Sequence, residues 1–435
     1  MRSRVDLAQR AHAVLEGNWR GAATRPGPRL YPHQWSWDSA FQAIGWSHVD
    51  WDRATTELRT LFAAQWPDGL LPHIVFHDGA AAYFPGPDVW ATPRRNTSGI
   101  VQPPLHATAA WLVARRSPSP EAARAFLGEL FGPLRAWHAY LYRERDLLGD
   151  GLAAIRHPWE SGQDDSPAWD PALHAIALDP EGVAPYARVD LTMAPADERP
   201  DPADYDHYIA LVHYIALVEY FKRHGYEEGA MRVHCPFWVV DPLFNSALAV
   251  AGEDLALIAD ALGEDPAPFR AQAQRTTAGL NARLWDGRLR RYLAYDARRK
   301  RPLPAPVAAC FVPVLTAAPD AGQVEALLRI LGSARFWSPA GHGATSYDRR
   351  GPGFSRHQYW RGPVWANVNW LLTRGLVRHG RTRAARRLLE ATLALVGGRG
   401  FWEYYDPETG EGLGSERFSW TAALVLDLLA LQAEV

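Results

Sequence analysis

The stretch EAARAFLGELFGPLRAWHAYLYRE, residues 121–144, carries the clearest helical pattern in the chain. Its apolar residues recur at intervals of three and four, which is the period of an amphipathic helix. A Ser-Pro-Glu sequence at 119–121 supplies a helix-start signal. Similar patterns lie at 206–225, 253–263, 322–334 and 383–398. Several close on glycine, as at Gly225 and Gly397, so the sequence predicts discrete, punctuated helices.

Segments rich in glycine, proline, tryptophan and histidine separate these helices. They are too aromatic for flexible linkers, and we expect ordered loops that build a site. They span residues 31–38, 83–104, 157–170, 351–365 and 398–420. Strand-like alternation is brief, at 288–296 and 307–314, so a parallel sheet with crossover helices is not favoured.

The recurrence of helix and aromatic loop fits a closed ring of helical hairpins with the loops gathered at one end. The expected fold class is all-α. No shift in composition marks a domain boundary, so we expect residues 1–435 to form a single domain whose loop insertions cap the site.

Charge and composition narrow the classes of function. The 46 basic and 48 acidic side chains give a net charge of -2, which excludes the usual electrostatic footprint of a nucleic-acid binder. No apolar run reaches the roughly 18 residues of a membrane span, and residues 1–17 lack the apolar core of a signal peptide. We therefore expect a cytoplasmic protein without a membrane partner.

Cysteine and aromatic usage point away from metals and towards sugars. Cys235 and Cys310 are far apart, and His33, His73 and His357 lack metal-ligand spacing, as does His157. We expect no metal and no organic cofactor. The 19 Trp, 16 Tyr and 15 Phe residues often stand beside Gly, Pro, Asp or His, where their flat faces suit sugar rings.

The most acidic aromatic loop spans residues 157–170. Glu160, Asp164 and Asp165 lie between Trp159 and Trp169. An acid among apolar rings, or beside another acid, has a raised pKa, as a general acid near neutral pH requires. The same residues also fit a helix start in which Asp and Ser cap backbone donors.

A second cluster of carboxylates lies near the C-terminus. Glu403 is flanked by aromatic residues, whereas Glu408 and Glu411 lie in a turn with Pro and Gly that is expected to face water. By itself Glu403 fits a general base or the buried partner of an arginine. Two distant carboxylates between aromatic walls are the minimum equipment for glycoside hydrolysis. The sequence contains no dinucleotide, P-loop, zinc-protease or nucleophile-elbow motif.

Three motifs resemble glycoside hydrolase family 63. The run ESGQDDSPAW at 160–169 resembles its E-S-G-x-D-x-S-P-x-W loop, and its core is similar to the E-S-G-W-D loop of the family 37 trehalases. The run YWRGPVWANVNW at 359–370 resembles the Y-W-R-G-P-x-W-x-N-x-N segment of family 63. Residues 401–404 with 418–421 resemble its closing motif. Within the family, the compact bacterial mannosylglycerate and glucosylglycerate hydrolases are the most similar branch.

The resemblance implies an (α/α)6 barrel and an inverting mechanism. Asp164 matches the general acid and Glu403 the general base, and Glu160 and Asp165 would tune or position Asp164. Inversion implies about 6.5–9.5 Å between the two carboxyl groups, which leaves room for water.

The same resemblance implies two subsites. The hexose side would be lined by Trp35, Asp38, Gln102, Trp360 and Trp365, although core packing also explains Trp35. The glycerate carboxylate calls for arginine and hydroxyl donors. The pair expected on that side is Arg199 and Tyr205, and the residues expected to assist are Tyr31, Tyr83 and Tyr359. Arg188 or Arg361 would serve the same purpose as Arg199.

Some of these assignments have plain structural alternatives. Arg199 also fits a surface arginine paired with Asp197 or Glu198. In a further stretch that is similar to the family, at 237–245, we expect Asp241 to cap a helix and Asn245 to satisfy backbone groups.

The expected function is the hydrolysis of mannosylglycerate or glucosylglycerate to hexose and D-glycerate. The small glycoside is the expected partner, and a homo-oligomer is compatible with the sequence. An α-glucosidase or trehalase-like hydrolase of neutral sugars is the alternative enzyme. A carbohydrate-binding protein on a degenerate barrel is the alternative from another class, but both carboxylate motifs are intact.

Overall fold

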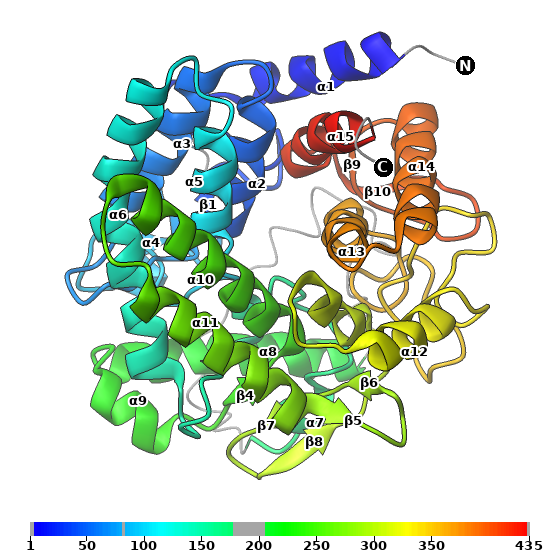
Figure 1. The fold of residues 1–435 in the computed structure, drawn as a ribbon. Helices are drawn as coiled ribbons and strands as arrows, with labels where there is room; N and C mark the ends of the chain where they lie inside the picture. Colours follow the sequence, from blue (N-terminus) through cyan, green and yellow to red (C-terminus); the bar gives the residue numbers. More distant parts are fainter. Residues whose placement is uncertain (1–3, 81–82, 177–204, 433–435) are drawn as a thin grey trace.

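The computed structural model describes residues 4–80, 83–176 and 205–432, and helices dominate these parts of the chain (Figure 1). The α-helices are α1 (Arg4–Asn18), α2 (Ser36–Trp46), α3 (Trp51–Ala63), α4 (Pro87–Trp90), α5 (His106–Ala114), α6 (Pro120–Tyr140), α7 (Asp170–Leu173), α8 (Tyr205–Arg223), α9 (Glu228–His234), α10 (Pro242–Leu262), α11 (Ala267–Gly279), α12 (Ala321–Leu331), α13 (Ala366–Arg378), α14 (Thr382–Arg399) and α15 (Ser419–Leu431). Shorter helical turns are η1 (Leu141–Arg145), η2 (Pro158–Ser161), η5 (Leu280–Leu284) and η6 (Ala308–Leu315).

The helix predicted from residue 121 is present as α6. Ser119 accepts a hydrogen bond from the amide of Ala122 at 3.1 Å, as an N-cap does. The helix continues into the π-type turn η1, and its buried side carries Leu130, Leu134 and Trp137. Two boundaries differ from the sequence patterns. The helix expected at 253–263 is the second half of α10, and α14 runs past Gly397.

Short strands are an addition to the all-α expectation. They are β1 (Gln34–Trp35), β2 (Ile74–Val75), β3 (Ala154–Ile155), β4 (Val239–Val240), β5 (Trp285–Asp286), β6 (Arg291–Tyr292), β7 (Ala294–Asp296), β8 (Arg301–Leu303), β9 (Trp402–Tyr405) and β10 (Gly412–Glu416). Within the described residues all strand pairings are antiparallel, and the largest sheet has the order β3-β4-β7-β8. The segment 307–314, which alternates like a strand, forms the helical turn η6 instead. All eight residues of η6 are buried, so apolar residues are not confined to one face and their spacing does not distinguish a helix from a strand.

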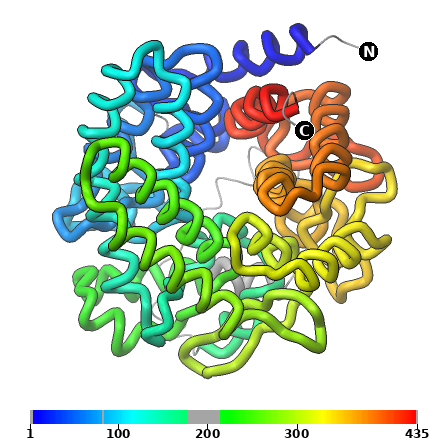
Figure 2. Tube along the Cα trace, viewed as in Figure 1, coloured from blue at the N-terminus to red at the C-terminus, as the bar shows by residue number. Residues whose placement is uncertain are grey.

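Six elements follow one another in space as they do in sequence. α2 packs against α5, α5 against α10, α10 against η6, η6 against α13, α13 against α15, and α15 against α2. A second set covers them: α1 lies on α15, α3 on α2, α6 on α5 and α10, α11 on α10, α12 on η6, and α14 on α13. Figure 2 shows the result, with α15 (red) beside the first helices (blue). α10 is long and apolar enough to cross a membrane by length and composition alone, but most of it is buried, as in a core helix.

The central elements α2, α13 and α15 run in the same direction. At their N-terminal ends, the ring of Trp420 lies 5.5 Å from that of Trp37 and 5.9 Å from that of Trp365. At the other end, the carboxylate of Asp427 in α15 accepts from Arg374 in α13 at 3.1 Å and contacts His48, just after α2, at 3.1 Å. The aromatic loops that precede these helices therefore meet on one side of the molecule.

The start of α10 confirms two expectations. Asp241 caps the helix by accepting from the amide of Phe244 at 2.8 Å. Asn245 accepts from the amide of Ala153 at 2.8 Å and donates to the carbonyl of the same residue at 2.8 Å. These bonds attach α10 to the residue before strand β3, shortly before the acidic loop.

Asp427 closes the far end and gives a prediction for stability. Burial alone would raise its pKa, but His48, Arg374 and Arg116 hold the pKa well below its ordinary value. Asp427→Asn would leave two arginines without their charge partner, so we expect a loss of about 3 kcal/mol in the free energy of unfolding at pH 7, measured by urea titration. Because the pKa of Asp427 is lower in the folded protein than in the unfolded chain, its ionised form stabilises the fold fully above the unfolded pKa of about 3.9. Below that pH the stabilisation is lost, so the difference in unfolding free energy between wild type and Asp427→Asn should become smaller.

The matched control is the exposed pair of Arg29 and Glu416, whose charged groups are 3.4 Å apart. Glu416→Gln should change stability much less, because exposed pairs contribute little. An Asp427→Asn variant as stable as the Glu416→Gln variant would contradict this role for Asp427.

Candidate active site

The acidic loop is held together by hydrogen bonds between its own side chains and its backbone. The ring of His157 accepts from the amide of Trp159 at 3.0 Å and starts the turn η2. The hydroxyl of Ser161 accepts from the amide of Gln163 at 2.8 Å, and the indole of Trp169 donates to the carbonyl of Gln163 at 2.8 Å. The loop is therefore an ordered unit that ends where α7 begins.

Gly162 fits this loop against the start of α2. Its φ is +67°, a left-handed conformation, and a Cβ atom there would stand 2.5 Å from the indole of Trp37. Only glycine accepts both the backbone angle and the close approach. The glycine of the E-S-G motif thus lets the acidic loop lie on the helix that carries Asp38.

Glu160 is buried and ionised. Both of its carboxylate oxygens accept from the guanidinium of Arg145, at 2.7 and 2.8 Å. Burial alone would raise the pKa of Glu160, but the charge and hydrogen bonds of Arg145, with those of Arg156, hold the pKa below its ordinary value. Glu160 is consequently unsuited to donate a proton.

Asp164 and Asp165 differ in exposure and in partners. Asp164 is half-buried, and the hydroxyl of Tyr214 in α8 donates to its carbonyl at 2.6 Å. Asp165 is buried and accepts from Arg361 at 3.2 Å. Arg361 also forks onto Asp170 at 2.9 and 2.8 Å. The guanidinium of Arg361 therefore holds the end of the acidic loop.

Glu403 lies on strand β9 and is buried. One of its carboxylate oxygens accepts from the hydroxyls of Tyr31 at 2.7 Å and Tyr359 at 3.1 Å. The other accepts from the amide of Ser415 on strand β10 at 3.0 Å. Gly414, with φ +71°, makes this approach feasible, because a Cβ atom there would be 2.6 Å from the carboxylate. The carboxylate is thus fixed in orientation by three segments.

Aromatic rings continue on both sides of Glu403. Trp35 lies with its ring 5.3 Å from that of Tyr31 and 5.1 Å from that of Tyr83. In a second group of rings, Trp360 and Trp365 stack at 3.8 Å, and Tyr359 meets Trp365 at 5.1 Å. The hydroxyls of Tyr31 and Tyr359 are 3.4 Å apart and join the two groups of rings. The rings expected to line a sugar therefore lie together.

Asp38 connects the two carboxylate clusters. It is buried in the first turn of α2. Burial raises its pKa well above the ordinary value, and the negative charges of Glu403 and Asp164 raise the pKa further. Gln102 lies beside this turn and accepts from the amide of Trp37 at 3.1 Å. Asp164 from the middle of the chain and Glu403 from near its C-terminus thus both lie close enough to Asp38 to influence its pKa.

Two of the residues expected in the glycerate subsite cannot be placed in the described part of the structure. Arg199 lies outside the described residues. Tyr205 is the first residue of α8, and its side chain is outside the described part. Within residues 4–80, 83–176 and 205–432, no group of three or more His, Cys, Asp or Glu side chains is arranged to hold a metal ion.

Sequence reasoning missed the residues that support the acidic loop. Arg145 stands in an Arg-Glu-Arg-Asp run that has the character of a solvated surface, and Tyr214 belongs to an amphipathic helix. The amide of Ser415 has no sequence signal at all. A buried carboxylate needs either a cation or several hydrogen-bond donors, so the aromatic setting of Glu160 indicated a buried partner but not that this partner is Arg145.

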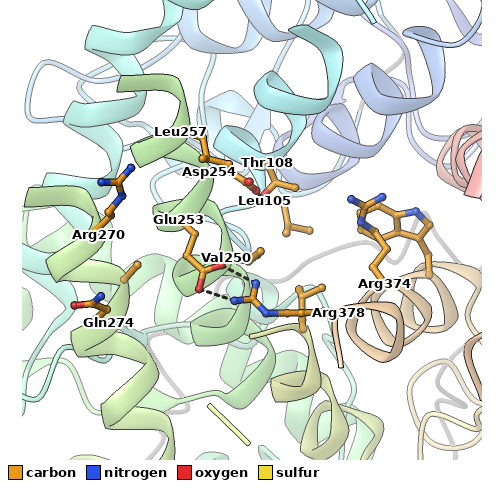
Figure 3. Close-up of a pocket in the computed structure, with 13 residues that line it drawn as sticks. Leu105, Thr108, Val250, Glu253, Asp254, Leu257, Arg270, Gln274, Arg374 and Arg378 are labelled. Carbon is orange, nitrogen blue, oxygen red and sulfur yellow. Dashed lines mark hydrogen bonds and ion pairs between the residues drawn. The ribbon is translucent and has the colours of Figure 1, made fainter. Parts of the chain in front are cut away.

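A separate hollow of about 510 Å³ lies between α5, α10, α11 and α13 (Figure 3). It is lined by an ion pair and by a buried carboxyl group that a threonine bonds. Arg378 forks onto Glu253 at 2.6 and 3.0 Å, and Thr108 donates to Asp254 at 2.6 Å. Burial raises the pKa of Asp254 to about 6. None of the expected site residues lines this hollow, so the candidate site rests on the converging carboxylates.

Comparison with known proteins gives a consistent result. The mannosylglycerate hydrolase MGH1-like glycoside hydrolase domain matches residues 31–421. A mannosylglycerate hydrolase of Rubrobacter radiotolerans is 46% identical over 433 residues, which cover 98% of this chain and 97% of that protein. A glucosylglycerate hydrolase of Mycolicibacterium hassiacum is 37% identical over 448 residues, with 98% of each chain covered. The crystal structure of a GH63 mannosylglycerate hydrolase from Thermus thermophilus in complex with Tris and D-glycerate has a TM-score of 0.90 and 43% identity, covering 97% of this chain and 99% of that chain.

The fit of Gly162 on Trp37 can be tested by substitution. Gly162→Ala should lower the free energy of unfolding by the cost of a left-handed alanine, about 1–2 kcal/mol, plus a further 1–3 kcal/mol (order of magnitude) for the clash. Gly149→Ala is the control, because Gly149 has φ +71° and nothing within 4 Å of an added Cβ. Urea unfolding of both variants isolates the clash. Equal losses would show that the loop does not press on Trp37.

Proposed function

This chain belongs to the mannosylglycerate hydrolase MGH1-like glycoside hydrolase family, and from that premise we propose that it cleaves the α-glycosidic bond of mannosylglycerate or glucosylglycerate, releasing hexose and D-glycerate. The membership confirms the resemblance to glycoside hydrolase family 63. The observation that carries the proposal is the convergence at Asp38. The charges of Glu403 and Asp164 both raise the pKa of this buried group. Asp38 therefore lies near both proposed catalytic carboxyls, which supports a single shared site.

In the proposed mechanism Asp164 protonates the glycosidic oxygen and Glu403 activates water. The water attacks the anomeric carbon from the face opposite the leaving glycerate, so the configuration inverts. The hydroxyls of Tyr31 and Tyr359 and the amide of Ser415 orient the Glu403 carboxylate for this step. Inversion requires about 6.5–9.5 Å between the two carboxyl groups, and we propose that separation here. The chemistry uses only side chains and water.

The proposed architecture is a single (α/α)6 barrel formed by residues 1–435. Support comes from the closed succession of α2, α5, α10, η6, α13 and α15, and from the second set of helices that covers it. In such a barrel the site lies at the N-terminal ends of the inner elements. The ring contacts of Trp420 with Trp37 and Trp365 agree with that position.

The proposed hexose subsite uses Trp35 and Trp360 as walls and Asp38 and Gln102 as partners of hydroxyl groups. Trp365, also expected as a wall, is completely buried and stacks on Trp360 at 3.8 Å and on Tyr404 at 4.7 Å, so we propose that it supports Trp360 from behind. Indole faces pack on the C–H faces of a sugar ring, and buried polar groups select its hydroxyls. Support comes from the rings of Trp35 and Trp365, which contact Tyr31 and Tyr359, the two hydroxyl donors to Glu403.

The proposed glycerate side uses Arg199 and Tyr205, assisted by Tyr31, Tyr83 and Tyr359. Arg361 was also expected here, but its forked contacts with Asp165 and Asp170 favour support of the acidic loop over direct contact with glycerate. We also propose a cytoplasmic location for the enzyme.

Asp164→Asn and Glu403→Gln test the roles of the two acids. Each variant should fold normally and lose at least about 1,000-fold in kcat, because each removes one of two coupled proton transfers. Hydrolysis is measured on mannosylglycerate, glucosylglycerate and trehalose in parallel. Glu411→Gln is the control, since Glu411 is close in sequence to Glu403 but exposed. Full activity of either acid variant, or activity on trehalose alone, would contradict the proposal.

Arg199→Ala tests the charge of the substrate. Loss of an arginine that binds a carboxylate should raise KM about tenfold or more for a glycerate glycoside, because a charge-assisted hydrogen bond contributes roughly 1.5–3 kcal/mol. The KM for a neutral disaccharide should not change. Steady-state kinetics on both substrates give the answer, and an unchanged KM for the glycerate glycoside would exclude Arg199 from that subsite.

A further inference from the structure

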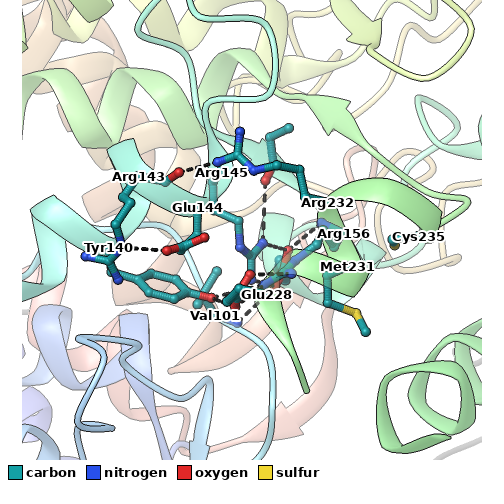
Figure 4. Close-up of polar contacts among 12 residues, drawn as sticks. Val101, Tyr140, Arg143, Glu144, Arg145, Arg156, Glu228, Met231, Arg232 and Cys235 are labelled. Atoms are coloured by element: carbon teal, nitrogen blue, oxygen red, sulfur yellow. Dashed lines mark hydrogen bonds and ion pairs between the residues drawn. The ribbon is translucent and has the colours of Figure 1, made fainter. Parts of the chain in front are cut away.

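One buried carboxylate, Glu160, collects four hydrogen-bond donors. Two come from the guanidinium of Arg145 at 2.7 and 2.8 Å. The others are backbone amides, from Val101 at 3.1 Å and Arg156 at 2.5 Å. Both charged side chains are completely buried. Figure 4 shows Arg145 and Arg156 converging beside Val101.

These donors come from segments that are distant in the sequence. Arg145 ends the turn η1 after α6, and its guanidinium also reaches the carbonyl of Ala154 on strand β3 at 3.5 Å. Val101 directly precedes Gln102, which in turn accepts from the amide of Trp37 at the start of α2. Glu160 itself opens the loop that leads to Asp164. The carboxylate is therefore the common point between the proposed acid loop and the proposed hexose subsite.

Stability alone does not account for this pair. Moving two charges out of water costs several kcal/mol for each ion, and a well-packed apolar pair of similar volume is often as stable. An apolar pair makes no directional contacts. In contrast, four hydrogen-bond donors that point at two oxygen atoms fix the relative positions of the segments that supply them. A fully hydrogen-bonded network of this kind is useful in an active site, where the positions of the catalytic groups determine the rate of the reaction.

We propose that Glu160 is a positioning residue that, clamped by Arg145, fixes the Val101–Gln102 segment and the acid loop against each other, so that Asp164 faces the glycosidic oxygen. The inference rests on the proposed function and deepens it. A displacement of about 1 Å at a proton donor is enough to cost roughly 100-fold in rate. Glu160 contacts the substrate in no step of this account; it acts through Asp164 and Gln102.

The adjacent ion pair offers a matched control. Arg156 forks onto Glu228 at 2.7 and 2.8 Å, and the hydroxyl of Tyr140 donates to the same carboxylate at 2.5 Å. This pair is also largely buried, and the bonds of the Glu228 carboxylate go to Tyr140 at the end of α6 and to Arg156, the residue after β3. Loss of Glu228 removes a comparable pair without removing the clamp.

The test compares Glu160→Gln with Glu228→Gln in the full chain. Glutamine at 160 presents an NH2 group to a site where four donors converge, so the clamp should open. We expect kcat on the hydrolysed glycerate glycoside to fall about 100-fold, while Glu228→Gln stays within about threefold of wild type. Thermal unfolding and active-enzyme concentration correct for any loss of folded protein.

The pH profile separates positioning from a merely structural role. In wild type, kcat/KM should fall on the alkaline side as the general acid loses its proton. In Glu160→Gln the residual turnover should lack this fall, because the displaced acid no longer contributes. Arg145→Lys, which keeps the charge but loses the fork, provides a second variant and should lose about tenfold in kcat with the alkaline fall weakened.

The outcomes are distinguishable. A wild-type enzyme that is inactive on both glycerate glycosides would refute the proposed function. An active wild type whose Glu160→Gln variant matches Glu228→Gln in kcat, or keeps the wild-type pH profile, would overturn the positioning role of Glu160.

Discussion

The common direction of the central helical elements is the constraint on which the candidate site depends. Because α2, α13 and α15 run the same way, the loops before them meet on one side, where Trp420 contacts both Trp37 and Trp365. The opposite ends are joined by Asp427, which is bonded to groups from three other segments. Without that shared direction, a carboxylate from the middle of the chain and one from its tail would have no reason to meet.

The two acids are held by different physical means. Asp164 belongs to a loop fixed at both ends by buried charge: Glu160 on Arg145 before it, and Asp165 on Arg361 after it. Glu403 lies on a strand and is oriented by neutral donors, two phenols and one backbone amide. Strand β9 is held in position by its backbone hydrogen bonds to β10. The acidic loop is not paired with a strand, so its ion pairs fix its position instead.

The sequence predicted the parts of this arrangement that are local. The helix from residue 121 and the cap at Asp241 follow from side-chain period and N-cap chemistry, and both are present. The segment 307–314 was misjudged as strand-like because burial on every side erases its period. Arg145 could not be found, since its partner is supplied by the fold and not by a neighbouring residue.

The identity of the anomer released first tests the central claim most directly, because it reports whether water attacks from the face opposite the leaving group. Proton NMR during the first minutes of hydrolysis, before mutarotation, resolves the two anomers of the free hexose. Two carboxyls on opposite sides of the sugar predict that an α-linked glycerate glycoside yields β-hexose first. Initial release of α-hexose would mean retention, and would contradict the account in which Glu403 activates water across the ring from Asp164.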